Sequence, residues 1–486
     1  MLVTTRIACA NFVFGANIEM ASDTRNSART ISYTIETTNA DASSRMIDTR
    51  GSHVVVIGGG FSGVAAATSL RAGGFEVTIL ERHAMLGGRA RSETRDGVVI
   101  DTGAQLIAST FTHATRMLAQ ARLEPTIARD VFVRDGARLP LQFGSIASMM
   151  RFAGLGATDK LRLGTKLLPL LARHRGALRA DAPGGLEDLD NLSAREFVEK
   201  TVSTRAADVL VEPPLNTFYG ARGRETSLAF FLTLGRYGSD AKLLASRAGW
   251  SAALAAAASD VRVEYEVVVE HLQMTSDAVI ARDAAGRTWR ADAAVIATGP
   301  RSAGELLGTT GGDATELRQW LTSITTRPTW TVMVALNRAV NGEAFGVLAD
   351  PTEAGMVSAC ALPALRWPEH GPSKGVVLAW PTPHAVEQLR DRSPTELVSS
   401  MMPEIERLVP EVRGAIERAR VFRFAEGTPL VAPGFIAHRA EGRRLADALP
   451  APIALAGDYL TMPILEGAVI SGERAAERIV RYLGRS

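Results

Sequence analysis

The stretch that decides the fold runs His53-Val54-Val55-Val56-Ile57-Gly58-Gly59-Gly60-Phe61-Ser62-Gly63. Its β-branched start, ended by glycines, is typical of a parallel strand that is buried on both faces. The spacing G-x-G-x-x-G then fits a tight turn from a strand into a helix. We expect the backbone from Gly58 to Gly63, including Phe61 and Ser62, to bind phosphate through the N–H groups at the helix start.

The residues that follow complete a strand–helix–strand unit. Val64 to Leu70 predicts a helix that Gly73-Gly74 stops, and Phe75 to Leu80 predicts a second strand. Glu81 stands at the end of that strand, where a carboxylate accepts hydrogen bonds from the hydroxyls of an adenosine ribose. We expect Glu81, with Arg82 beside it, to contact a dinucleotide. An acidic residue here disfavours a 2′-phosphate and therefore NADP.

The spacing of a second glycine pair separates FAD from NAD. Gly87-Gly88-Arg89-Ala90-Arg91-Ser92 follows Glu81 at a distance that NAD enzymes do not normally show. Val54 to Ser92 resembles the fingerprint of the FAD-dependent amine oxidase, protoporphyrinogen oxidase and phytoene desaturase superfamily. The resemblance implies that Gly87 and Gly88 lie beside the pyrophosphate and that Arg89 lies near phosphate and flavin. It also implies that the segment 101–105, with Ala104 and Gln105, passes close to the flavin.

The C-terminal sequence is similar to the closing motif of the same superfamily. That motif is Ala456-Gly457-Asp458-Tyr459-Leu460, then Glu466-Gly467-Ala468 and Ser471-Gly472. The resemblance implies cofactor contacts for Gly457, Asp458, Glu466, Gly467 and Ala468. Asp458 would accept a ribityl hydroxyl, and the positive end of the helix from Glu466 would face the flavin ring. Val267 is the expected main-chain contact to adenine, with Val269 as the alternative.

The order of the elements predicts an α/β fold, namely an FAD-binding Rossmann-like domain with an inserted α+β substrate domain. The FAD-binding domain would comprise 52–105, 246–305 and 421–486, and the substrate domain 106–245 and 306–420. Expected elements outside the fingerprint include a helix over Thr158–His174 and a strand over Val261–Val269. Residues 1–51 lack periodicity, so we interpret them as a disordered extension or as the product of a start assigned upstream of Met46.

Composition excludes several classes of function. The 54 basic residues barely exceed the 52 acidic ones, which argues against a nucleic-acid partner. The two cysteines, Cys9 and Cys360, form no disulfide framework, and a cytoplasmic location fits best. The eight histidines show no metal-ligand spacing, so we expect no metal.

The sequence says less about the substrate than about the cofactor. A flavin carries the redox chemistry itself, so no acid–base pair is required and no catalytic residue is assigned. Amine oxidases of the superfamily place a lysine and an aromatic cage by the flavin, whereas here Lys374 looks like a turn residue and Ile464 takes the aromatic position. We therefore expect removal of hydride from a hydrophobic substrate, as in protoporphyrinogen oxidase or the carotenoid and squalene desaturases, with oxygen or a quinone as electron acceptor. The alternatives are an amine oxidase, an FAD-dependent isomerase, or a binding protein without redox turnover.

The segment Ser145–Arg179 mixes leucines and methionines with six lysines and arginines between Arg151 and Arg175. Basic amphipathic helices of this kind lie on anionic lipid, which predicts peripheral contact with a membrane and entry of a lipophilic substrate from it. The alternative is an ordinary helical subdomain with a solvated basic face.

Overall fold

The computed structural model describes residues 51–484 except 96–97, 127–128, 143–144, 182–183, 240, 341, 343, 367–373 and 451. The prediction of a disordered extension falls on 1–51 and lies, but for Gly51, outside the described residues. None of the described helices is long and apolar enough to cross a membrane.

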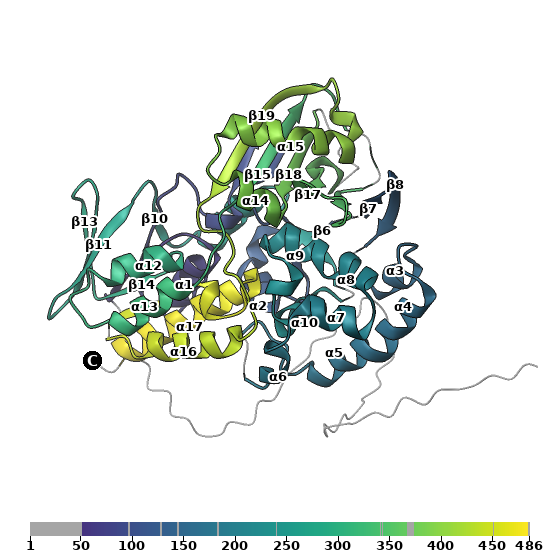
Figure 1. Cartoon of the computed structure of the whole chain (residues 1–486). Helices are drawn as coiled ribbons and strands as arrows, with labels where there is room; N and C mark the ends of the chain where they lie inside the picture. The colour runs from purple at the N-terminus through teal and green to yellow at the C-terminus, as the bar shows by residue number, and fades with distance from the viewer. Residues whose placement is uncertain are drawn as a thin grey trace, which may run out of the picture. The chain divides into compact units, whose positions relative to one another are not determined.

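A five-stranded parallel sheet contains the predicted strand–helix–strand unit (Figure 1). In spatial order its strands are β10 (Arg262–Glu264), β2 (Glu76–Leu80), β1 (His53–Ile57), β14 (Ala293–Ile296) and β20 (Ile453–Leu455). The strand β1 has the predicted bounds and pairs in parallel with β2 and β14. Helix α1 (Phe61–Ala72) connects β1 to β2 and starts three residues before the predicted Val64, so it includes part of the glycine turn.

The last helix, α17 (Leu465–Leu483), packs directly on α1. Gly472 makes this possible, because a Cβ atom added there would lie 2.1 Å from the carbonyl oxygen of Ser62 and 2.8 Å from Cβ of Ala65. The small side chains Ala65, Ala66 and Ala67 are fully buried on the same helix. The C-terminal helix therefore fixes the position of the N-terminal turn of α1.

The predicted strand Val261–Val269 is divided in two. Its first part is β10, which pairs with β2, and its end opens β11 (Val269–Met274) of a separate antiparallel sheet with β12 (Val279–Asp283) and β13 (Thr288–Ala291). Glu266 lies between the two strands with a φ of 58°, a left-handed conformation that ends an extended strand. The change of direction brings Val267 against Glu81, where its N–H donates to the Glu81 carbonyl oxygen at 2.9 Å.

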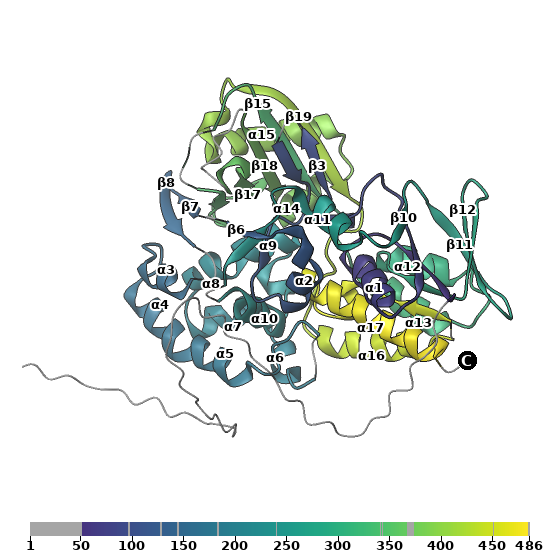
Figure 2. The same cartoon turned by 180° about the vertical axis from the view of Figure 1, so that it is seen from behind.

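A seven-stranded sheet forms the second part of the described chain. In spatial order its strands are β19 (Ile416–Phe424), β15 (Thr329–Leu336), β18 (Val376–Pro381), β17 (Val357–Ala361), β16 (Gly346–Ala349), β7 (Asp130–Arg134) and β8 (Ala137–Leu141). All neighbours are antiparallel except β16 and β7. Figure 2 shows α15 (Pro394–Leu408) beside this sheet, and its Leu397, Met401 and Ile405 pack into a core with the strands. The sheet thus joins two distant stretches of sequence into one α+β part, and β19 runs past the predicted domain boundary at 420.

Helices between β8 and β9 (Leu243–Ala245) form a third layer. They are α3 (Ile146–Arg151), α4 (Ala157–Arg162), α5 (Leu168–His174), α6 (Glu187–Asp190), α7 (Ala194–Thr201), α8 (Thr204–Leu210), α9 (Glu212–Tyr219) and α10 (Leu228–Gly238). The helix predicted over Thr158–His174 contains a π-helical turn at Leu163–Leu167, where the N–H of Leu168 reaches back to the Leu163 carbonyl. Pro169 follows this turn and has no N–H to donate to the carbonyl four residues earlier, which accounts for the widened turn.

We predict that Gly472→Ala lowers the stability of the fold. The added methyl group has to push α17 away from the Ser62 carbonyl, and overpacking of this kind costs about 1–3 kcal/mol. Gly235→Ala in α10 is the matched control, because its Cβ would meet only Leu171 at 3.8 Å. It should raise stability by roughly 0.5–1 kcal/mol. Thermal unfolding of both variants checks the prediction, and a melting temperature for Gly472→Ala at or above that of the unchanged protein would contradict it.

Candidate functional site

The turn from β1 into α1 forms a cradle of backbone. Gly58 has a φ of +107°, which few residues other than glycine adopt, and a Cβ atom on Gly63 would lie 1.9 Å from the Gly58 carbonyl oxygen. A Cβ atom on Gly60 would meet nothing within 4 Å, so open space adjoins the backbone there. Among the described residues, no side chain caps the start of α1 at Gly60. The N-terminal turn of α1 thus offers its N–H groups to an anion, as a dinucleotide phosphate requires.

Glu81 is buried at the end of β2, with 3% of its surface exposed. One carboxylate oxygen accepts a hydrogen bond from the Gly59 N–H at 2.6 Å, and the other accepts one from the His83 N–H at 2.8 Å. Each carboxylate oxygen has further lone pairs, so the group remains able to accept from ribose hydroxyls. Arg82 is exposed and donates to the ring of His83.

The two predicted glycine loops lie against each other. The Gly87 N–H donates to the Gly59 carbonyl at 2.8 Å, and a Cβ atom on Gly88 would lie 3.5 Å from Cα of Gly60. Glycine backbone from both loops therefore lines one space, which fits a pyrophosphate. The sequence predicted this proximity only through the family resemblance.

Arg89 and Asp458 meet although they are far apart in the sequence. The guanidinium donates to the Asp458 carboxylate at 2.7 Å and to the Gly427 carbonyl at 3.0 Å. Burial and the Asp458 charge together raise the pKa of Tyr219 and of Tyr459, so both phenols stay neutral around this carboxylate. Tyr219, at the end of α9, and Gly427 were not predicted, because no motif marks either position.

The predicted segment 101–105 lies against the backbone of Arg89. The Thr102 N–H donates to the Arg91 carbonyl at 3.0 Å, and the Ala104 N–H donates to the Arg89 carbonyl at 3.4 Å. The Gln105 side chain donates to the carbonyls of Asp101 and Gly103 within its own loop. The Gln105 amide group therefore stabilises the loop.

The side chain of Glu466 contacts the start of another helix, and the predicted role of the helix N-terminus at the flavin stays a prediction. The buried carboxylate of Glu466 accepts from the backbone N–H groups of His113 at 3.0 Å and Ala114 at 2.9 Å, at the start of α2 (Thr112–Met117). A contact to the cofactor would thus use the backbone of α17, where Glu466, Gly467 and Ala468 form the first turn. The N–H of Val267 is likewise engaged by Glu81, so a contact to adenine would use its carbonyl oxygen.

The substrate side contains no buried lysine. All five lysines of the chain belong to the described residues, and each is exposed or half-exposed. Lys374 forms an ion pair with Glu417 at 3.0 Å on the sheet surface. Ile464 is buried in a hydrophobic core with Met462 and Phe435, close in sequence to Asp458.

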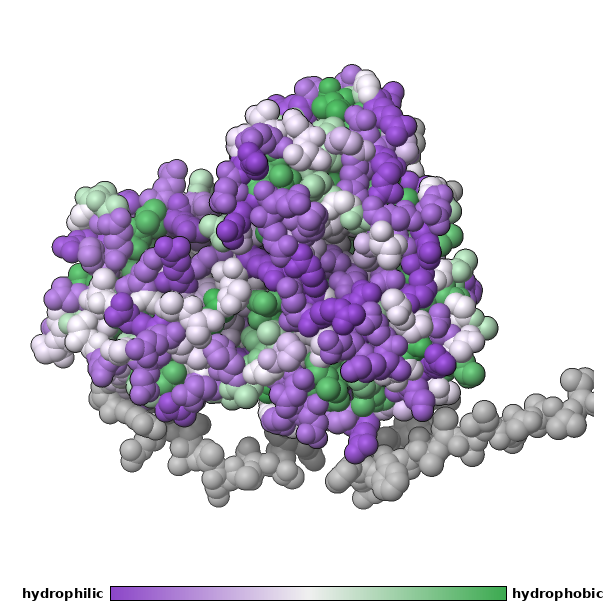
Figure 3. Space-filling model, viewed as in Figure 1, coloured by the Kyte–Doolittle hydropathy of each residue, from purple (hydrophilic) through white to green (hydrophobic). Residues whose placement is uncertain are grey.

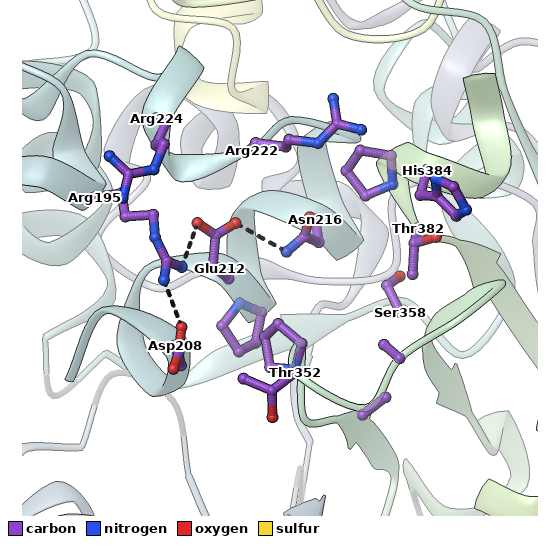
Figure 4. Close-up of a pocket in the computed structure, with 15 residues that line it drawn as sticks. Arg195, Asp208, Glu212, Asn216, Arg222, Arg224, Thr352, Ser358, Thr382 and His384 are labelled. Atoms are coloured by element: carbon purple, nitrogen blue, oxygen red, sulfur yellow. Dashed lines mark hydrogen bonds and ion pairs between the residues drawn. The ribbon is translucent and has the colours of Figure 1, made fainter. Parts of the chain in front are cut away.

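A pocket of about 450 Å³ lies between the helical layer and the seven-stranded sheet (Figure 4). Arg195 points there toward Glu212 at 2.9 Å and Asp208 at 2.8 Å, so one guanidinium is shared by two carboxylates. None of the predicted cofactor residues lines the pocket. Helix α9 connects the two places, since Glu212 at its start lines the pocket and the charge of Asp458 reaches Tyr219 at its end.

We predict that Glu81→Ala weakens the retention of FAD. The change removes the acceptor of two backbone N–H groups and of the ribose hydroxyls, and hydrogen bonds to a charged group contribute about 1.5–3 kcal/mol each. Glu76→Ala, at the exposed start of the same strand, is the matched control and should keep its flavin. Flavin content after purification, read from absorbance, checks the prediction. Equal flavin content in both variants would place the ribose elsewhere.

Comparison with known proteins gives the family. The profile of the flavin containing amine oxidoreductases matches residues 61–480. The carotenoid phi-ring synthase of Streptomyces griseus is 30% identical over 197 residues, 36% of each chain. Protoporphyrinogen oxidase 2 of Arabidopsis thaliana is 25% identical over 169 residues, 34% of this chain and 32% of that one. The chain therefore matches about a third of the length of these curated relatives.

A solved structure extends the likeness over nearly the whole fold. The cyclohexylamine oxidase of Brevibacterium oxydans superposes with a TM-score of 0.67 at 17% identity, over 89% of this chain and 99% of that one. This likeness concerns the fold, whereas the family profile covers most of the chain. The paired glycine loops, the buried Glu81 and the Arg89–Asp458 pair fit the two ends of an FAD molecule. The chain belongs to the flavin containing amine oxidoreductase family.

Proposed function

We propose that the protein dehydrogenates a hydrophobic organic substrate. Bound FAD supplies the hydride acceptor, and the chain supplies binding, orientation and the exclusion of water. The observation that carries the proposal is the apolar packing of the residues that follow Asp458 in the C-terminal motif. Met462 and Ile464 are buried in one hydrophobic core with Phe230, and the Tyr219 ring packs edge-on against Phe230 with centroids 5.0 Å apart.

The absence of a buried lysine supports this proposal over amine oxidation. The family resemblance implies a lysine beside the flavin in amine oxidases, and in this chain every lysine lies at the surface. Lys374, the nearest in sequence to the C-terminal motif, is neutralised by Glu417. Amine oxidation and isomerisation without net redox turnover remain the alternative functions, and both use the same cofactor site.

Anaerobic mixing of the oxidised protein with candidate substrates tests the proposed reaction. We expect a porphyrinogen or an acyclic carotenoid precursor to bleach the flavin band, because the substrate loses a hydride and a proton while the flavin gains two electrons. Oxygen or a quinone should then restore the band. Cyclohexylamine and putrescine serve as comparison substrates and should leave it unchanged. Bleaching by the amines alone would favour amine oxidation, and a rearranged product without bleaching would favour an isomerase.

We further propose that the helices α3, α4 and α5 rest on a membrane from which the substrate enters. Three large hydrophobic side chains of this segment are exposed, namely Met150 at 46%, Leu161 at 66% and Leu168 at 38%. Lys166 and Arg173 are exposed on the same segment. Figure 3 shows hydrophobic residues interspersed with hydrophilic ones on the side where Figure 1 places these helices.

The exposed apolar face is smaller than the sequence predicted. Phe152, Leu155, Leu163 and Leu167 are buried in the helical core and are not available to lipid. A surface that mixes cationic and apolar side chains still binds an anionic membrane, because burial of the apolar side chains and attraction of the charges both contribute. A helical subdomain with a solvated basic face remains the alternative.

Co-sedimentation with anionic liposomes tests the membrane contact. We predict that changing Lys160, Lys166 and Arg173 to glutamate abolishes binding, because each basic residue near an anionic surface contributes about 1 kcal/mol. Arg162 is left unchanged, since it donates to the Val202 carbonyl at 2.7 Å and supports the fold. Changing Arg262, Arg282 and Arg301 to glutamate alters the net charge equally on exposed positions elsewhere. Equal sedimentation of the two triple variants would refute the assigned surface.

A further inference from the structure

Arg366 reaches from the seven-stranded part of the chain to the FAD-binding part. It ends the 3₁₀ turn Pro363–Arg366 after β17, and 2% of its surface is exposed. Its guanidinium donates to the Asp101 carboxylate at 2.6 Å and to the Gln105 side-chain carbonyl, and it lies over the Phe345 ring at 5.1 Å. Asp101 is itself only 1% exposed. The ion pair is therefore buried on both sides.

The two acceptors of Arg366 hold one loop from both ends. Asp101 also accepts from the Ser92 hydroxyl at 2.6 Å, and Gln105 donates to the Asp101 and Gly103 carbonyls at 2.5 and 3.0 Å. A second contact comes from the same sheet, because the Thr331 hydroxyl donates to the Thr102 carbonyl at 2.7 Å. The conformation of the loop 101–105 thus depends on residues of the seven-stranded part.

The loop in turn fixes Arg89. A Cβ atom on Gly103 would lie 2.0 Å from the Arg89 carbonyl oxygen, so the two backbones are in direct contact. The hydrogen bond from Ala104 to the Arg89 carbonyl lies at the same place. Displacement of the loop would move the backbone of Arg89, whose guanidinium reaches Asp458 at 2.7 Å.

Stability alone does not account for this arrangement. Desolvation of two charges offsets most of their attraction, so a buried ion pair commonly stabilises a fold no more than apolar side chains would. Among the described residues, Nε of Arg366 also finds no hydrogen-bond partner although it is buried. Since desolvation and the unpartnered Nε both cost free energy, the ion pair is better explained by the conformation that it imposes on the loop 101–105.

We propose that Arg366 is a positioning residue of the cofactor site, which holds the loop 101–105 against Arg89 and so makes FAD binding depend on the docking of the seven-stranded part. Arg366 does not touch the reacting atoms in this role. The proposal concerns the cofactor and holds for any substrate that the flavin oxidises, so the substrate test above and the test below fail independently.

A double variant that leaves the net charge unchanged distinguishes a positioning role of Arg366 from a role in balancing the charge of Asp101. Asp101→Asn with Arg366→Met removes both charges, and the asparagine oxygen still accepts from Ser92. The readouts are the dissociation constant of FAD, titrated into deflavinated protein, and the visible spectrum of the bound flavin. The melting temperature of the deflavinated protein reports the fold separately. Arg205→Met with Asp350→Asn is the matched control, because this ion pair, at 2.7 Å, also includes a fully buried aspartate but joins α8 to the end of β16.

We expect the double variant at 101 and 366 to bind FAD about ten- to a hundredfold more weakly, the range found when residues that support metal ligands are removed. Its flavin spectrum should shift, and the control double variant should keep both the affinity and the spectrum. Arg366→Lys keeps the charge but not the two-pronged hydrogen bonding, so it should also weaken FAD binding. Unchanged affinity in both Arg366 variants, or an equal loss in the control, would overturn the proposal.

Discussion

Close backbone contact at the start of α1 is the constraint on which the site depends. Gly63 lies against the Gly58 carbonyl and Gly472 lies against the Ser62 carbonyl, both at distances that no side chain would permit. The first contact shapes the turn, and the second presses the last helix of the chain onto it. The N–H groups of α1 thereby keep their direction, which is what a backbone anion site requires because it has no flexible side chain to adjust.

Four buried carboxylates organise the surroundings of this turn. Glu81 accepts from the first glycine loop, Asp101 pairs with Arg366, Asp458 pairs with Arg89, and Glu466 caps α2. Each is compensated by backbone N–H groups or an arginine, as buried charges must be. Met462 and Ile464, which follow Asp458 in the sequence, are instead buried among apolar side chains.

Sequence patterns predicted those features of the fold that depend on residues close together in the sequence. The bounds of β1, the glycine turn and Glu81 follow from a run of β-branched residues and fixed spacings, and the structure has them in place. The meeting of Arg89 with Asp458 was predictable only by resemblance, since the two are 369 positions apart. Arg366, Tyr219 and Gly427 reach the site through tertiary packing and carry no motif. The split of the strand at Glu266 depends on one left-handed residue, which composition does not signal.

A crystal structure of the protein with bound FAD tests the assigned cofactor site most directly. We expect the adenosine ribose on the Glu81 carboxylate, the pyrophosphate between the loops at Gly58–Gly63 and Gly87–Gly88, and the flavin ring between Asp458 and the 101–105 loop. A flavin located in the pocket lined by Arg195 and Glu212, or a ribose without contact to Glu81, would contradict this assignment.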